Sequence, residues 1–365
     1  MARKLQFDKL LFLATFLLVC ASVVMVYSAS AVMALERYQQ PYLFLIKQGM
    51  WAALGIAVLA IVMRVDYRSY RNPTFLWVSL GIVGVALVLV LFSTPINGAR
   101  RWFGVGNIGI QPSELAKLCA IFFIAALLER RMHRIDEVSY ALVPIAIAVG
   151  LLVALILLEP DFGTAMSLMT IAAVMVFAAG LSYRYLVGAL LVGFPVVYFV
   201  LMSAEYRRRR LLAFWNPWDD PLGDGFQIIQ SLIAVGTGGV FGRGLMEGVQ
   251  KLFYLPEPHT DFIYAVISEE LGLMGATAVL ACFCVIAWRG FRIAMQAPDG
   301  FGALLALGLT TMIALQAFVN ISVVLGLLPT KGVPLPFVSA GGSSLLINLL
   351  GTGILLNVSQ HATHG

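Results

Sequence analysis

The sequence predicts an all-α polytopic membrane protein with about ten transmembrane helices and both termini in the cytoplasm. The first observation behind this prediction is the composition. Of the 365 residues, 60% are hydrophobic and only 12% are charged, against about 45–50% and about 25% in soluble domains. The second is a series of apolar stretches long enough to cross a bilayer. The surplus of apolar residues must face lipid, which excludes a soluble enzyme, a disordered chain and a disulfide scaffold.

Ten stretches approach the length of about 20 apolar residues that a membrane helix needs. They cover residues 10–30, 43–63, 74–93, 113–129, 139–158, 162–180, 185–203, 262–288, 302–325 and 343–358. The first lacks a small-residue cleavage site and is followed by further spans, so we expect an anchor rather than a removed signal peptide. No repeat or linker divides the chain, and residues 1–365 are predicted to form a single transmembrane domain.

The basic residues of the short loops set the orientation, because such loops are richer in Lys and Arg on the cytoplasmic side. They favour a cytoplasmic N-terminus, and an even number of spans then returns the C-terminus to that side. The net charge of +5 is not taken as a sign of a nucleic-acid partner. The basic residues on the outer side work against this orientation rule and indicate either an anionic ligand at the outer face or contact with lipid headgroups. A long outer loop is predicted between the seventh and eighth spans, at about 204–261. Its aromatic residues, among them Trp215 and Trp218, indicate short helices lying on the outer surface.

A charged pair opens the fourth span, in the motif Gln111-Pro-Ser-Glu-Leu-Ala-Lys117. Glu114 and Lys117 are three residues apart, so they share one helical face and can form an ion pair. One interpretation is a structural pair that fixes helix packing. The other is a pair that lines a substrate cavity, because ionisable residues within a membrane are costly and mark function by default.

Two further acidic clusters lie at outer ends of spans. Glu159-Pro160-Asp161 reads as a tight turn between the fifth and sixth spans. Glu257, His259 and Asp261 place three titratable groups within five residues before the eighth span. Asp261 either caps that helix or acts as a general base tuned by its crowded surroundings.

A broken segment is predicted at about 328–342, where closely spaced prolines and glycines exclude a regular helix. Non-helical backbone at membrane depth is tolerated only when it is buried in protein or lines a cavity. Ser343 follows Gly341-Gly342 at the start of the last span, where backbone N–H groups suit a phosphate.

Three motifs carry a resemblance that covers the whole chain. They are Gln111–Lys117, Phe253-Tyr-Leu-Pro-Glu-Pro-His-Thr-Asp-Phe262 and Pro334-Leu-Pro-Phe-Val-Ser-Ala-Gly-Gly-Ser-Ser344. The chain resembles the SEDS family (shape, elongation, division and sporulation) of bacterial wall-building membrane proteins. Pro329-Thr-Lys-Gly332 and Leu356-Asn-Val-Ser-Gln360 are more like the division branch, FtsW, than the elongation branch, RodA.

The resemblance implies ten membrane helices in the bacterial cytoplasmic (inner) membrane and an active site facing the periplasm. It implies peptidoglycan glycosyltransferase activity on lipid II during septal wall synthesis. The implied partners are a class B penicillin-binding protein, which supplies the transpeptidase, and other divisome proteins. By the same resemblance Asp261 is the catalytic carboxylate, Glu114 and Lys117 are the essential pair, and Lys47 matches a basic position on the second helix.

The implied reaction converts an α-linked phosphate into a β-glycoside, so it requires inversion at the anomeric carbon. The acceptor hydroxyl needs a general base, for which Asp261 is the candidate. The departing undecaprenyl pyrophosphate needs positive charge, and the candidate contacts are Arg100, Arg101, Lys117 and Lys331. A divalent cation (Mg or Mn) near Asp261 is compatible with this chemistry, although the sequence offers no ligand set.

Two other functions account for part of the pattern. A lipid II flippase would explain the polar cavity residues and the broken segment, but not the carboxylate clusters on the outer side. A scaffold that recruits division proteins would leave Glu114, Lys117 and Asp261 unexplained. Small residues in the eighth and ninth spans either contact the partner's membrane helix or pack the bundle internally. They are Gly272, Gly275, Ala276, Ala278, Gly302, Ala303, Ala306 and Gly308.

Overall fold

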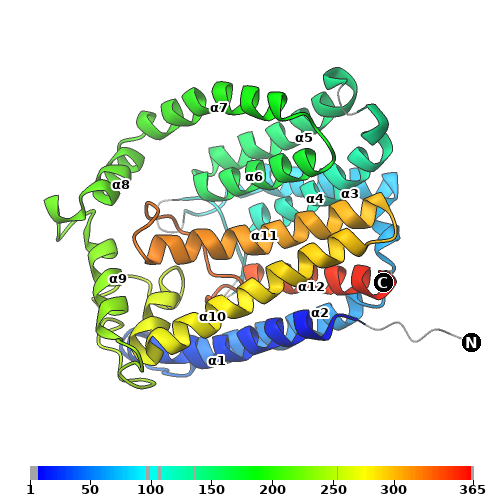
Figure 1. Cartoon of the computed structure of the whole chain (residues 1–365). Coiled ribbons are helices and arrows are strands. Elements are labelled where there is room, and N and C mark those ends of the chain that lie inside the picture. Colours follow the sequence, from blue (N-terminus) through cyan, green and yellow to red (C-terminus); the bar gives the residue numbers. More distant parts are fainter. Residues whose placement is uncertain (1–6, 96–98, 106–107, 135–136, 253, 363–365) are drawn as a thin grey trace, which may run out of the picture.

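The structure is a computed structural model, and it describes residues 7–95, 99–105, 108–134, 137–252 and 254–362. Phe253, the first residue of the second family-like motif, lies outside them. Each of the ten predicted stretches coincides with a helix (Figure 1). These helices are α1 Lys9–Tyr38, α2 Leu43–Val62, α3 Pro73–Val90, α4 Pro112–Arg131, α5 Val138–Leu158, α6 Phe162–Ala178, α7 Tyr183–Ser203, α10 Ile263–Gln296, α11 Gly300–Val324 and α12 Gly342–His361.

Six of these helices, α1 to α3 and α10 to α12, are long and apolar enough to cross a membrane among the residues described. Side-chain caps fix several helix starts: Asp8 accepts from the Leu11 N–H and Asp299 from that of Gly302, as Asp at an N-cap position does. α1 and α10 continue well past their predicted ends, to Tyr38 and Gln296. The extensions carry charged residues, Glu36 and Arg37 in α1 and Arg289 and Arg292 in α10, which hydropathy alone assigns to loops.

The start of α1 and the end of α12 lie at the same end of the helical bundle (Figure 1). There the Asp8 carboxylate pairs with Arg289 Nη2 of α10 at 2.6 Å, and the Asp8 N–H donates to Ser359 Oγ of α12 at 3.1 Å. These contacts hold the start of α1 against the ends of two other helices. The placement of both termini on the cytoplasmic side of a membrane stays a prediction.

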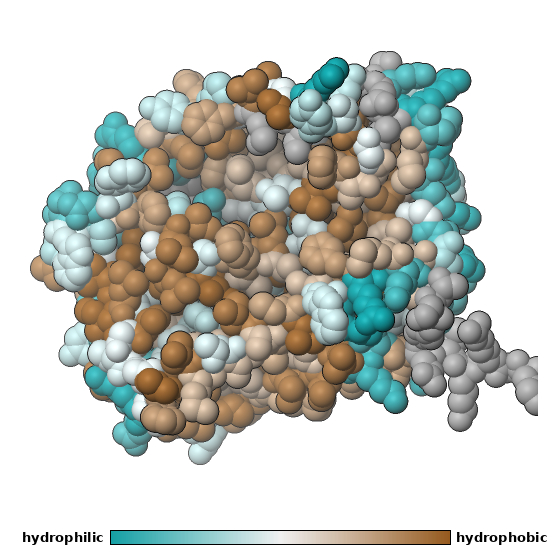
Figure 2. All heavy atoms as spheres, in the orientation of Figure 1, coloured by the Kyte–Doolittle hydropathy of each residue, from teal (hydrophilic) through white to brown (hydrophobic). Residues whose placement is uncertain are grey.

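The centre of the bundle is formed by α4, α11 and α12, most of whose residues are buried. In contrast, α7 lies at the periphery (Figure 1), and its Leu191 and Phe199 are 71% and 73% exposed. Hydrophobic residues cover much of the visible side of the bundle, and hydrophilic ones gather toward its two ends (Figure 2). This distribution is that of a helical bundle with lipid as its solvent.

The end opposite the termini carries the elements of the outer loop. α8 Glu205–Trp215, the 3-10 turn η3 Pro217–Asp219 and α9 Phe226–Thr237 are the short helices expected there. A small antiparallel hairpin, β1 Phe103–Val105 with β2 Ile108–Ile110, pairs Phe103 with Ile110 and was not predicted. Two further 3-10 turns, η1 Tyr67–Arg71 and η2 Met132–Arg134, lie in connections between helices.

Two adjacent carboxylates of α10 hold the loop that follows α9. Glu269 Oε1 accepts from the backbone N–H of Val249 at 2.9 Å. Glu270 Oε2 accepts from the Met246 N–H at 3.1 Å, and Glu270 Oε1 pairs with Lys251 Nζ at 2.6 Å. Both carboxylates are completely buried. These two acids, which lie within the eighth predicted span, therefore have a structural role.

Most of the small residues in α10 and α11 pack the bundle internally. A side chain at Gly308 would meet Ile121 and Met175, and one at Gly290 would meet Thr310. The buried members of the predicted contact set are Gly272, Ala276, Gly302, Ala306 and Gly308. The internal alternative is therefore correct for these five, whereas Ala278 is exposed.

Candidate functional site

Asp261 lies in the outer loop, two residues before α10 begins at Ile263. α10 has no side-chain cap, and the Asp261 carboxylate forms no hydrogen bond or ion pair with any residue the structure describes. Its backbone carbonyl is fixed by Asn320 Nδ2 at 2.8 Å. The helix-cap interpretation is therefore wrong. Burial, and then the Glu257 carboxylate, raise the pKa of Asp261 to about 6.

His259, two residues earlier, contacts α2. Its ring packs against Phe44 with centroids 4.7 Å apart and the planes tilted by 55°, and its Nε2 is 3.9 Å from Glu257 Oε2. Burial, with a smaller effect of Arg37, lowers the pKa of His259 to about 4, so the imidazole is neutral at neutral pH. No three His, Cys, Asp or Glu side chains gather as a metal site in the described part of the chain. A divalent cation at Asp261 stays a prediction.

A cavity of about 120 Å³ lies beside Asp261 and contains four basic side chains. Arg101, Arg207, Arg210 and Lys331 line it, and we refer to it as the cationic cavity. Gly332 also lines it, and a Cβ on this glycine would lie 3.2 Å from Asp261 Oδ2. The cavity thus places a concentration of positive charge next to a free carboxylate, as a leaving anion and a general base would require.

Three separate parts of the chain supply these cations. Arg101 precedes β1 and is held by the turn between α5 and α6, where its guanidinium donates to the backbone carbonyls of Glu159 and Pro160. Arg207 and Arg210 lie three residues apart on α8, and Lys331 belongs to the broken segment. Sequence reasoning named Arg101 and Lys331 but missed the two α8 arginines. Their i, i+3 spacing within the run 207–210 was the available signal.

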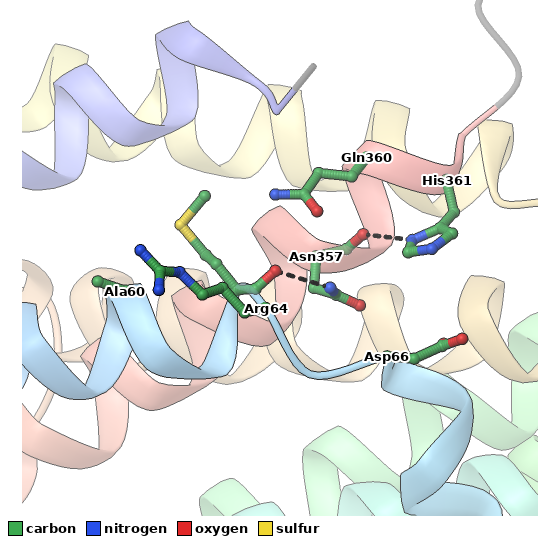
Figure 3. A pocket seen from close by; sticks show the side chains of 7 residues that line it. Ala60, Arg64, Asp66, Asn357, Gln360 and His361 are labelled. Atoms are coloured by element: carbon green, nitrogen blue, oxygen red, sulfur yellow. Dashed lines mark hydrogen bonds between the residues drawn. The ribbon is translucent and has the colours of Figure 1, made fainter. Parts of the chain in front are cut away.

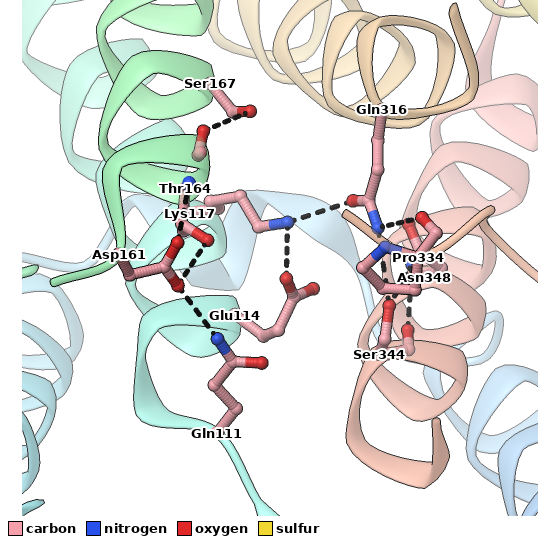
Figure 4. A network of polar contacts seen from close by, with 11 residues as sticks. Gln111, Glu114, Lys117, Asp161, Thr164, Ser167, Gln316, Pro334, Ser344 and Asn348 are labelled. Carbon is pink, nitrogen blue, oxygen red and sulfur yellow. Dashed lines mark hydrogen bonds and ion pairs between the residues drawn. The ribbon is translucent and has the colours of Figure 1, made fainter. Parts of the chain in front are cut away.

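Glu114 and Lys117 form the predicted ion pair, deep in the bundle (Figure 4). Lys117 Nζ lies 2.8 Å from Glu114 Oε1 and 2.9 Å from Gln316 Oε1 of α11. Gln316 Nε2 in turn donates to the Pro334 carbonyl at 3.0 Å, which ties the network to the broken segment. Both side chains of the pair are 4% exposed. The pairing is confirmed, whereas contact of this pair with a substrate stays a prediction.

Unpaired polar atoms surround this network. Glu114 Oε2, Ser113 Oγ and Ser343 Oγ are all buried without a hydrogen-bond partner. Ser343 lies in the first turn of α12, as predicted. Buried groups of this kind are rare in folded proteins and are normally satisfied by water or a ligand. The network therefore has unsatisfied polar groups beside its ion pair, and we refer to these buried polar side chains together as the polar chamber.

The turn between α5 and α6 has two different carboxylates. Asp161 caps α6 through the Thr164 N–H at 3.1 Å and accepts from Gln111 Nε2 at 3.0 Å, so the turn interpretation is correct for it (Figure 4). Glu159 is completely buried, and neither of its oxygens has a partner. Burial, and then Asp161, raise the pKa of Glu159 to about 8. The sequence signal for this group was a carboxylate closing an apolar run.

Two predicted contacts lie apart from the cationic cavity. Arg100 donates from Nη1 to the Leu91 carbonyl at 2.9 Å and does not line the cavity. Lys47 Nζ lies 5.7 Å from the centroid of the Phe44 ring, on the His259 side of the loop. The structure therefore brings Asp261, Arg101 and Lys331 together, and it places Glu114, Lys117 and Ser343 in the neighbouring polar chamber.

A larger cavity of about 500 Å³ lies at the opposite end of the bundle, where α2 and α12 end (Figure 3). Arg64, Asp66 and His361 are among its lining residues. Asn357 Nδ2 donates to the Met63 carbonyl at 2.9 Å and joins the two helix ends there. Neither Glu257, His259 and Asp261 nor any residue of the cationic cavity lines this larger cavity. The candidate site is therefore the smaller cavity beside Asp261.

Comparison with known proteins now adds to this geometry. The FtsW/RodA/SpoVE cell cycle protein model matches residues 8–364. The chain belongs to this family. A relative from Geobacter metallireducens, described as a probable peptidoglycan glycosyltransferase FtsW, is 45% identical over 359 residues, covering 97% of this chain and 95% of the relative. Stage V sporulation protein E of Bacillus subtilis is 43% identical over 367 residues, covering 99% of each chain.

Solved structures have the same fold. A chain from a peptidoglycan synthase complex that coordinates polymerization and crosslinking matches with a TM-score of 0.81 and 32% identity, over 97% of this chain and 98% of that one. The rod shape determining protein RodA of Thermus thermophilus matches with a TM-score of 0.73 and 28% identity, over 99% of each chain. The predicted SEDS resemblance is confirmed.

Proposed function

We propose that the chain is a peptidoglycan glycosyltransferase that joins lipid II disaccharides into glycan strands during septal wall synthesis. The observation that carries this proposal is the free Asp261 carboxylate beside the cationic cavity. The relative named as a probable FtsW glycosyltransferase supports the same activity.

In the proposed reaction Asp261 acts as the general base. With a pKa of about 6 it is ionised at neutral pH, and it is still basic enough to accept the proton of the acceptor sugar's 4-hydroxyl. The hydroxyl oxygen attacks the anomeric carbon of the donor with inversion. The bond from that carbon to the phosphate oxygen breaks, and undecaprenyl pyrophosphate leaves with the electron pair. Arg101, Lys331 and the α8 arginines stabilise the negative charge that develops on it.

The test is polymerisation of labelled lipid II by the purified chain together with its partner. Formation of glycan polymer in detergent supports the enzyme. Movement of lipid II across vesicle membranes without polymer would support the flippase instead. The absence of both activities would support the scaffold. A parallel titration with Mg²⁺, Mn²⁺ and a chelator tests the metal prediction, which requires activity to fall on chelation.

We place the chain in the bacterial cytoplasmic membrane with ten spans, both termini inside and the cationic cavity facing the periplasm. The common position of the termini supports this orientation, as does the apolar surface of the bundle. Labelling of single cysteines from each side of the membrane, at position 222 in the outer loop and at position 66 near the α2 end, tests it directly. Both positions labelling from the same side would contradict the orientation.

The proposed partner is a single-span class B penicillin-binding protein within the divisome, and it contacts the exposed face of α10. The matching chain from a peptidoglycan synthase complex supports such a partner. Ala278 is the exposed small residue there, so Ala278→Trp should block close helix contact.

We expect Ala278→Trp to lower copurification with the partner and to lower polymerisation, without lowering the amount of inserted protein. Ala303→Trp, at a half-buried position of the neighbouring α11, is a control for general bulk. Undisturbed copurification of the Ala278 variant, with crosslinks mapping to α1 or α6, would place the partner on another face.

A further inference from the structure

The cationic cavity contains one aromatic side chain between its basic groups. Phe162 lines the cavity and starts α6 directly after its cap, Asp161. Lys331 Nζ lies over the Phe162 ring at 5.0 Å from its centroid, and Arg207 Cζ lies over it at 5.9 Å. Both distances are within the range of cation–π attraction, which extends to about 6 Å.

Lys331 depends on this ring. Among the residues the structure describes, its ammonium group has no carboxylate or hydrogen-bond acceptor as partner. Burial lowers its pKa, in keeping with a cation removed from water. The nearest acidic side chain of the cavity lining, Asp161, is already engaged by Thr164 and Gln111. The ring is therefore the described group that orients Lys331.

An aromatic ring holds a cation differently from a carboxylate. It attracts through its quadrupole and carries no net charge, so the cation keeps its full charge for a further partner. A carboxylate in the same place would neutralise Lys331 and repel an anion. Because Lys331 and Arg207 come from different elements, the broken segment and α8, a shared ring also fixes their relative positions.

The first turn of α6, which carries this ring, is held in place. Asp161 caps the first turn of α6, and a Cβ on Gly163 would lie 3.1 Å from Val333 Cγ2 of the broken segment. The first turn of α6 is thus packed against the segment that carries Lys331. Rotation of Phe162 out of the cavity would take away the described partner of Lys331, whereas Arg207 would keep the bond from its Nη1 to the Val200 carbonyl at 2.7 Å.

We propose that Phe162 is a positioning residue of a diphosphate site, and that its ring holds Lys331 and Arg207 in register for a pyrophosphate group without neutralising them. The assignment of pyrophosphate rests on the proposed function, while the dependence of anion binding on the ring does not. The site takes a diphosphate, as a free ion or at the head of a lipid.

The experiment measures inorganic pyrophosphate binding by calorimetry to the full-length purified protein, for the wild type and three variants. Phe162→Leu removes the π face and keeps an apolar side chain. It is expected to weaken binding roughly 3- to 30-fold, the range of a cation–π contact between exposed and desolvated settings. Phe162→Tyr keeps the face and should bind within about twofold of the wild type. Phe177→Leu, a matched change at an exposed ring on the same helix, should have no effect.

A double-variant cycle separates positioning from packing. In a Lys331→Met background, Phe162→Leu should lose much of its effect, because one of the two cations it orients is gone. Melting temperatures without pyrophosphate should be equal for Phe162→Leu and Phe162→Tyr. Phe162→Leu binding like the wild type, or Phe162→Tyr binding as weakly as Phe162→Leu, would overturn the inference.

Polymerisation assays on the same samples distinguish the two proposals. Under the proposed function, Phe162→Leu raises the KM for lipid II more than it lowers kcat. A wild type that binds pyrophosphate with the aromatic dependence described, and yet makes no polymer, would remove the proposed function and leave the diphosphate site standing. A wild type that makes polymer and binds no pyrophosphate would remove the site alone.

Discussion

Replacement of Asp261 by Asn is expected to lower the rate of lipid II polymerisation by about 10²–10⁴-fold, the usual contribution of a general base. The amide keeps the size of the side chain, and the backbone bond from Asn320 to position 261 is unaffected. Folding and membrane insertion should therefore be normal. Turnover of labelled lipid II, measured beside the melting temperature, checks both statements. Near-normal turnover of the Asn variant would show that Asp261 is not the general base.

The pH profile gives an independent test of the same role. The base must be ionised, so activity should fall as the pH decreases through about 6, the pKa to which burial and Glu257 raise Asp261. Glu257→Gln is the matched control on the same loop. It removes a carboxylate that raises the Asp261 pKa, so activity should persist and its acidic limb should move to lower pH. An unchanged limb would show that another group titrates.

Single changes at Glu114 or Lys117 are expected to cost roughly 3–5 kcal/mol of stability, because each leaves the other charge buried and unpaired. The pair lies at 2.8 Å with both side chains 4% exposed. Exchange of the two residues should restore the stability. If Lys117 contacts the substrate, the exchanged protein should stay inactive, and full activity would show a purely structural pair.

A matched control for this experiment is the ion pair between Arg71 and Glu129 at the opposite end of the bundle. Its Arg71 side chain is 46% exposed, so loss of either partner should cost less than about 1 kcal/mol. Comparable losses at both pairs would mean that the polar chamber is open to water and that burial does not strengthen the Glu114–Lys117 interaction.

The helices of this fold were largely predictable because lipid imposes a simple requirement on each of them. Every spanning segment must be apolar over about 20 residues, and such a stretch can be recognised from the sequence alone. The predicted ranges coincide with the observed helices even at α5 and α7, which contain Pro144 and Pro195. The hairpin between Phe103 and Ile110 escaped prediction because each strand has only three residues, too few for alternation to show.

The candidate site was only partly predictable. The Glu114–Lys117 pair follows from local spacing on one helix, and sequence suffices for such contacts. The cationic cavity depends on three distant segments that fold into contact around Asp261, and spacing says nothing about that. Arg100 and Arg101 are neighbours in sequence, yet one donates to Leu91 and the other lines the cavity. Asp161 and Glu159 also lie close together in sequence but differ in role: Asp161 caps a helix, whereas Glu159 is an unpaired buried acid.

The hydrogen bonds and ion pairs that Glu269 and Glu270 form with the loop after α9 determine which positions of that loop tolerate substitution. Glu269 binds main-chain N–H groups of Val249 and Gln250, and Glu270 binds one at Met246 besides the side chains of Ser28 and Lys251. Any residue except proline supplies such an N–H group. Side chains at Met246, Val249 and Gln250 can change without loosening the loop. Gly248 cannot, since a Cβ there would lie 3.0 Å from Glu270 Oε1. We therefore expect most substitutions in this segment to be tolerated. Proline, any replacement of Gly248 and any change of Glu269 or Glu270 should not be tolerated.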